Sequence, residues 1–269
     1  MPAIRQPAVA GLFYPGEPEV LLHDVRELLA AAQPHTFTSK VLIVPHAGYI
    51  YSGAIAASAY ASLGAAAARI RRVVLLGPAH RVAVRGLALP SADRFATPLG
   101  EIALDTDAAH AISHLPQVVH SAAAHAQEHS LEVQLPFLQI VLGDFRLLPL
   151  VVGMATAEEV AEVLELLWGG DETLIVISSD LSHYLPYEVA KGIDNATVQH
   201  VLRLEQPIVH EQACGATPIN GVVLAASRHH LTPHLLDLRN SGDTAGSRDG
   251  VVGYAAFAFT PASNTGDRT

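Results

Sequence analysis

Three short runs of apolar residues stand out in the hydrophobic pattern of the chain. They are Val41–Val44, Val73–Leu76 and Leu174–Ile177, and each is apolar at every position and contains β-branched residues. Strands without polar alternation are typical of a parallel sheet that helices cover on both faces. We therefore predict that the three runs are mutually parallel members of one central sheet.

Segments with helical spacing alternate with these runs. We expect helices over residues 17–32, 53–68, 130–141, 155–167, 187–204 and 218–228. Thr156 followed by Glu159 forms a capping-box pattern, and Pro136 must kink or split the third of these helices. Further strands are expected over residues 85–89, 101–104, 145–152 and 251–259. The pattern predicts one α/β domain over residues 1–260, with a central mixed, mostly parallel sheet between helices, and a flexible tail over residues 261–269.

Composition narrows the class of protein. The 269 residues are 50% hydrophobic and carry 16 Lys and Arg against 26 Asp and Glu, a formal charge of −10. This composition excludes general disorder and argues against nucleic acid as a partner. The N-terminus lacks the apolar core of a signal peptide, and no run reaches the length of a membrane span. We expect a cytoplasmic protein that does not associate with a membrane.

Residues able to bind metal or transfer protons follow each of the three apolar runs. His46, His80 and Asp180 come within four residues of their ends, and the carboxyl ends of parallel strands share one edge of a sheet. The single cysteine, Cys214, precedes a predicted helix with Thr217 as N-cap and Pro218 as first residue. A cysteine near a helix N-terminus favours the thiolate, which suits a ligand or a nucleophile.

Several neighbouring residues are candidates with a structural alternative. Asp180 and His183 are spaced so that the carboxylate can orient the imidazole for acid–base work, although both could be ordinary loop residues. His129 is a further proton carrier or pocket residue, or a structural histidine. Tyr49 and Tyr51 line the pocket or pack at the strand–helix corner. We interpret four other histidines as surface residues: His110, His114, His120 and His125.

Eight sequence blocks, in order, carry a family resemblance. They are AGLFYP from residue 10, PHAGYIYSG from 45, LGPAH from 76, TPLG from 97, EHSLEVQLPF from 128, SSDLSHY from 178, CGATPI from 214 and GYAA from 253. With them the chain resembles the Memo family, including its bacterial and archaeal members called AmmeMemoRadiSam system protein B. The resemblance implies a fold like that of class III extradiol dioxygenases. It also implies that His46, His80 and Cys214 are metal ligands with Asp180 and His183 beside them.

The resemblance leaves three functions open. The first is a non-haem iron redox or dioxygenase-like enzyme acting on an unknown small molecule; Fe(II) is the expected ion, with Cu or Zn as alternatives because the third ligand is a thiolate. The second is a hydrolase with Cys214 as nucleophile, His183 as base and Asp180 orienting it. The third is a non-enzymatic module that binds a peptide or partner in the same pocket. The family name also suggests a functional link to a radical S-adenosylmethionine protein.

Overall fold

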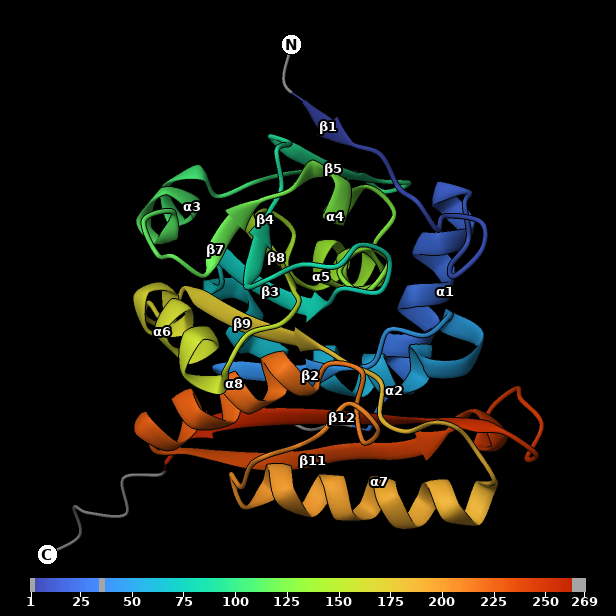
Figure 1. Ribbon diagram of the computed structural model, residues 1–269. Helices are drawn as coiled ribbons and strands as arrows, with labels where there is room; N and C mark the ends of the chain where they lie inside the picture. The colour runs from blue at the N-terminus through green and yellow to red at the C-terminus, as the bar shows by residue number, and fades with distance from the viewer. Residues whose placement is uncertain (1–2, 34–36, 263–269) are drawn as a thin grey trace, which may run out of the picture.

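A mixed sheet forms the centre of the protein (Figure 1). This computed structural model describes residues 3–33 and 37–262. Within them the main sheet has nine strands in the order β7-β4-β8-β3-β9-β2-β12-β11, with β10 also paired to β12. Their bounds are β2 Val41–Val44, β3 Arg72–Pro78, β4 Leu87–Leu89, β7 Val118–His120, β8 Arg146–Val152, β9 Thr173–Ser178, β10 His183–Leu185, β11 Leu231–Asn240 and β12 Val251–Pro261. A smaller sheet contains β1 Ile4–Arg5, β5 Arg94–Thr97 and β6 Gly100–Ala103.

The three predicted core strands are parallel, as expected. β9 lies between β2 and β3 and is parallel to both, with Val44 opposite Ser178 and Leu76 opposite Ile177. β8 continues the parallel block next to β3, whereas β4 and β12 run antiparallel to their neighbours β8 and β2. The carboxyl ends of β2, β3 and β9 therefore share one edge of the sheet.

Helices cover both faces of this sheet because alternate residues of each core strand point into two separate apolar cores. Leu42 and Val44 belong to one core, and Val41 and Ile43 belong to the other. The first core is covered by α1 Pro18–Ala31, α2 Tyr49–Ala61, α4 Ala122–Ala126 and α5 Leu135–Leu142. The second is covered by α3 Thr106–Ile112, α6 Ala157–Leu167, α7 Tyr187–Leu202 and α8 Ala216–Arg228, of which α6 and α8 pack side by side (Figure 1). The prediction of a mixed α/β fold with helices on both faces is confirmed.

Local signals in the sequence account for several element boundaries. Thr156 caps α6, and its reciprocal bond with Glu159 completes the predicted capping box. Pro136 divides the helix expected over residues 130–141 into a 3₁₀ turn, η2 Glu132–Gln134, and α5. Two more 3₁₀ turns are η1 Gly64–Arg69 and η3 Ser241–Asp243.

Several local predictions were wrong or missing. The helix expected over residues 53–68 is α2, which begins at Tyr49 and ends at Ala61, followed by the 3₁₀ turn η1. α8 begins at Ala216 with Gly215 as N-cap, not at Pro218 after Thr217, because a proline is tolerated anywhere in the first helical turn, where the N–H groups are unpaired. His125 is buried rather than on the surface, with its Nε2 bonded to the carbonyl of Ala88. β11 was not predicted, since it is an edge strand that is only partly buried. Of the predicted tail, residues 263–269 lie outside the described part of the chain.

Candidate metal centre

Three imidazoles meet at the carboxyl edge of the central sheet. His46 follows β2, His80 follows β3, and His129 lies in the segment between α4 and η2. One nitrogen of each ring lies within 4.8 Å of one nitrogen of each of the other two. The ring centroids are 4.7 to 5.5 Å apart. The structure thus brings together two residues predicted as ligands and one, His129, predicted as a pocket residue or proton carrier.

A close contact between β3 and the residue 128–131 segment places the third histidine. A Cβ atom on Gly77 would lie 2.7 Å from the Ser130 hydroxyl and 2.9 Å from a methyl group of Leu131. Only a residue without a side chain permits this approach. The Ser130 hydroxyl also donates to the carbonyl of Pro78. The segment therefore docks directly on the end of β3, and His129 comes to lie beside His80.

Hydrogen bonds fix the tautomer of His46. Its Nδ1 lies 2.9 Å from the Ser178 hydroxyl, which donates its only proton to the carbonyl of Ser130 and also accepts from the Gln134 amide. The Gln134 oxygen in turn accepts from Tyr60. The Ser178 oxygen can therefore only accept from His46, so Nδ1 carries the proton and Nε2 carries the free electron pair. His46 is 2% exposed, and burial and the two neighbouring imidazoles lower its pKa well below the ordinary value.

Glu128 supports His80 and lies beside His129. Its Oε1 lies 2.9 Å from His80 Nδ1 and 3.5 Å from His129 Nδ1, and its Oε2 accepts the backbone N–H of His80. Burial alone would raise the pKa of Glu128, but the bonds from His80 and Ser130 lower it to about 2. A carboxylate bonded to the outer nitrogen of a histidine is a common support for metal ligands. His129 Nδ1 is buried and has no hydrogen-bond partner among the described residues. Burial lowers the pKa of His129, so the ring stays neutral and able to bind a metal.

Cys214 lies next to this group but is not one of its three members. Its Sγ is 3.4 Å from Nε2 of His46. Two donor atoms on one tetrahedral metal ion lie roughly 3.5 Å apart, so the pair is compatible with a shared ion. A Cβ on Gly215 would lie 2.6 Å from the Ser179 side chain, and this close approach holds the cysteine against the end of β9. Ligation by Cys214 stays a prediction.

The expected preference of Cys214 for the thiolate is not found. Burial and the nearby Asp180 carboxylate raise the pKa of the thiol to about 12. The cysteine precedes the N-cap of α8, and the favourable field of the helix does not compensate for the loss of solvent. Without a metal, the sulfur is therefore a thiol at neutral pH.

Asp180 and His183 do not form the predicted hydrogen bond with each other, and each bonds another group. Asp180 is buried and accepts the backbone N–H of His46 at 2.7 Å, so it fixes the loop that carries a ligand; burial raises its pKa. The ring of His183 is oriented instead by the carbonyl of Leu181, 2.8 Å from Nδ1. That bond leaves Nε2 of His183 as an acceptor. His183 therefore remains the candidate base, with a backbone carbonyl in place of a carboxylate as its orienting group.

A pocket of about 750 Å³ joins His80, His183 and Cys214. Its walls are mainly aliphatic and include Val84, Val152 and Ile193, and this volume suits a small molecule. The described residues that line it do not include the two tyrosines predicted as pocket residues. Tyr49 is buried and donates to the carbonyl of Val133, and Tyr51 is partly exposed on α2.

Sequence reasoning missed the main supports of the centre. Ser178 and Gln134, which orient His46, are neutral residues inside ordinary strand and turn patterns. Glu128 and His129 carried a signal in the EHSLEVQLPF block, but neither directly follows a core strand. Reasoning from the ends of strands therefore left Glu128 out and gave His129 only as a pocket residue or proton carrier, not as a ligand.

Fold and site together define an α/β protein with a three-histidine centre at the carboxyl edge of its sheet. The chain belongs to the Memo family: residues 5–258 match the Memo-like protein family. It is 37% identical to a MEMO1 family protein of Methanosarcina barkeri, over 94% of this chain and 99% of the relative. It is 36% identical to one of Aquifex aeolicus and 35% identical to one of Sulfolobus acidocaldarius, each over 95% of this chain and 99% of the relative. None of the described helices is both long and apolar enough to span a bilayer.

Proposed function

We propose that this chain binds one transition-metal ion through His46, His80 and His129, with Cys214 as an additional sulfur donor. The observation that carries the proposal is the convergence of three imidazole nitrogens within 4.8 Å. Hydrogen bonds to Nδ1 leave Nε2 of His46 and His80 free, which is how ligand histidines are prepared. Imidazole and thiolate donors suit Fe(II), Cu and Zn, and we propose Fe(II).

We further propose that the centre serves a redox, dioxygenase-like reaction on a small molecule. A redox-active ion supplies electron-transfer chemistry that side chains alone do not have. The protein supplies a pocket with mainly aliphatic walls and one group for proton transfer, Nε2 of His183. Glu128 and Asp180 hold His80 and His46 in place and are positioning residues. A cytoplasmic location and a functional link to a radical S-adenosylmethionine protein belong to the same proposal.

The geometry does not favour the hydrolase alternative. The sulfur of Cys214 contacts His46, not the candidate base His183, and burial raises the pKa of the thiol. A cysteine nucleophile needs an effective base within hydrogen-bond distance or a lowered pKa. Nε2 of His46 is within that distance, but burial and the neighbouring imidazoles lower the pKa of His46 well below its ordinary value and make it a weak base. Esterase or peptidase turnover by metal-free protein, abolished by alkylation of Cys214, would reverse this conclusion.

Elemental analysis after anaerobic purification tests the metal proposal. We expect close to one ion per wild-type chain and loss of the ion in His46→Ala and His129→Ala. His234→Ala is the matched control, because His234 bonds Thr260 on β12 and lies outside the centre. Equal metal contents in wild type and His46→Ala would refute the site.

Two further variants separate the roles within the site. If Cys214→Ser keeps the metal and His129→Ala loses it, the ligands are the three histidines. If instead Cys214→Ser loses the metal and His129→Ala keeps it, the ligands are His46, His80 and Cys214. His183→Ala should keep the metal while any oxygen-dependent turnover falls by roughly 10²–10⁴-fold, the usual contribution of a positioned proton carrier. Loss of metal in His183→Ala would instead make His183 a ligand.

A further inference from the structure

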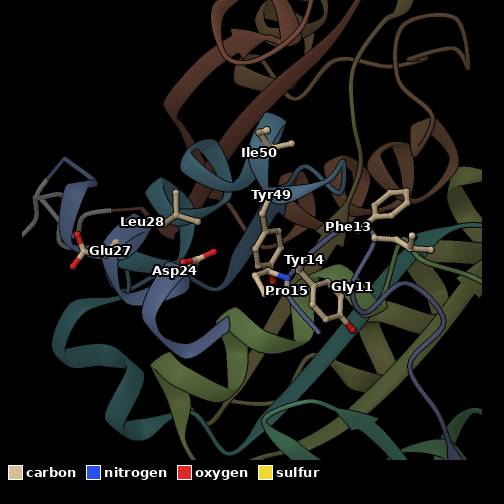
Figure 2. A pocket seen from close by; sticks show the side chains of 10 residues that line it. Gly11, Phe13, Tyr14, Pro15, Asp24, Glu27, Leu28, Tyr49 and Ile50 are labelled. Atoms are coloured by element: carbon tan, nitrogen blue, oxygen red, sulfur yellow. The ribbon is translucent and has the colours of Figure 1, made fainter. Parts of the chain in front are cut away.

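A second cavity lies outside the metal centre, between α1, the loop over residues 11–15 and the start of α2 (Figure 2). Its volume is about 600 Å³. None of the three ligand histidines lines it. The loop lies between the two sites: Phe13 lines the second cavity, as Gly11 and Pro15 do, and its ring also packs against His129 at a centroid distance of 4.8 Å. We call this cavity the α1 groove.

Exposed apolar side chains border the α1 groove. Leu12 is 80% exposed and Ile50 is 72% exposed, and both line the cavity. Few large apolar side chains of the described chain are as exposed as these two. Leu28 and Tyr49 provide further apolar lining (Figure 2). Concentration of exposed apolar surface around a cavity marks a site of contact with another molecule rather than chance exposure.

One wall of the α1 groove is acidic. Asp24 and Glu27 are three residues apart on α1, and both line the cavity. Figure 2 shows the Asp24 carboxylate directed toward Pro15 and Tyr49, while Glu27 lies further out along α1. Neither carboxylate forms a salt bridge with any residue in the described part of the chain. Unpaired carboxylates beside apolar surface complement a partner that presents a cation next to an apolar side chain.

The groove is held in shape without a ligand. Tyr49 donates its N–H to the carbonyl of Phe13, and Gly11 donates to the carbonyl of Tyr14. The Tyr14 hydroxyl bonds the buried Glu132. α1 and α2 pack closely, since a Cβ on Gly53 would lie 3.0 Å from Leu28. A preformed surface loses little conformational freedom on binding, so a short segment can dock on it.

We propose that the α1 groove binds a segment of a partner protein in which an aliphatic or aromatic residue lies next to arginine or lysine. The cation pairs with Asp24 and Glu27, and the apolar side chain packs between Leu12 and Ile50. The net charge of −10 also favours approach of a basic segment. This site is separate from the metal pocket, so the proposal does not depend on what the centre binds.

Fluorescence anisotropy with short labelled peptides tests the proposal. The probe is an eight-residue peptide with leucine and tryptophan flanked by two arginines, and its partner peptide carries glutamates in place of the arginines. We expect only the arginine peptide to bind, with an affinity that falls between 50 and 300 mM salt. The double variant Asp24→Asn/Glu27→Gln should bind it roughly tenfold more weakly and with less dependence on salt.

Controls make the result specific to this surface. Ile50→Ser should also weaken binding, whereas Glu188→Gln/Val189→Ser, which changes an exposed acidic and apolar pair on α7, should not. Metal content should be the same in all of these variants. The proposal is overturned if the arginine peptide does not bind wild type below about 1 mM, or binds the Asp24/Glu27 variant equally well. It is also overturned if sedimentation shows self-association that Ile50→Ser abolishes, because a second copy then covers the groove.

Discussion

Substitution of Glu128 by glutamine tests whether this carboxylate prepares the metal centre. Three N–H groups point at it: Nδ1 and the backbone N–H of His80, and the backbone N–H of Ser130. Two of them share Oε1, so the best glutamine orientation keeps that oxygen and turns its NH₂ toward the backbone N–H of His80. One strong bond is lost, and the backbone N–H of His80 and the new NH₂ group face each other without an acceptor, which costs about 2–3 kcal/mol.

Two measurements test the effects of this substitution. In a chain of this size a loss of 2–3 kcal/mol lowers the melting temperature of metal-free protein by roughly 4–10 °C. Because His80 loses the charge of its supporting carboxylate, metal affinity should also fall about 10–100-fold, measured by competition with a coloured chelator.

A second carboxylate–histidine pair provides the matched control. Glu165 Oε2 lies 2.7 Å from Nε2 of His229, away from the centre, and both side chains are about one-third exposed. Glu165→Gln should therefore change stability by less than about 1 kcal/mol and leave metal affinity unchanged. Metal affinity within twofold of wild type in Glu128→Gln would refute the supporting role of Glu128.

Three other substitutions probe the framework. Gly77→Ala should destabilise the folded protein by about 1–3 kcal/mol and reduce its metal content, because the new Cβ would collide with Ser130. A wild-type metal content in the purified variant would contradict this. Arg5→Met leaves the buried Glu132 charge unpaired and should cost about 3–5 kcal/mol in denaturant unfolding, and a cost below 1 kcal/mol would show that Glu132 is satisfied without it. Asp105→Ala removes the N-cap of α3 and should cost about 1 kcal/mol. Burial would raise the pKa of Asp105, but the backbone N–H of Ala108 and the side chain of Arg72 lower it below its ordinary value. The carboxylate therefore stabilises the folded state above pH 3.8, and this stabilisation is lost as the pH falls through the lower pKa of the folded state. If the difference in free energy of unfolding between wild type and Asp105→Ala stays constant down to pH 2, this dependence on pH is excluded.

The parallel core of the fold was predictable because its strands are apolar at every position. Val41–Val44, Val73–Leu76 and Leu174–Ile177 have no other plausible environment than a sheet covered on both faces. The same reasoning placed His46 and His80 at one edge. β11 was not predicted because an edge strand needs neither a continuous apolar run nor a strict alternation of apolar and polar residues.

The rest of the site depends on contacts between distant segments. His129 reaches His80 only because Gly77 lets the residue 128–131 segment lie against β3, a contact that neither segment reveals by itself. The orientation of His183 depends on the carbonyl of Leu181, and backbone partners cannot be read from residue types. The pKa of Cys214 depended on burial, which outweighs the helix terminus that the sequence did reveal.

The two edges of the central sheet limit how this protein can join with others. On one side, β11 bonds only to β12 among the described strands, and it carries Pro233, which has no N–H to donate, together with the charged pair Asp237 and Arg239. On the other side, β7 has only three residues. Short strands, prolines and charges at an edge discourage another chain from adding a strand. Growth of the central sheet across molecules, the usual route to aggregates of β-rich proteins, is therefore disfavoured at both ends, which leaves mainly helix and loop surfaces around this sheet for specific association.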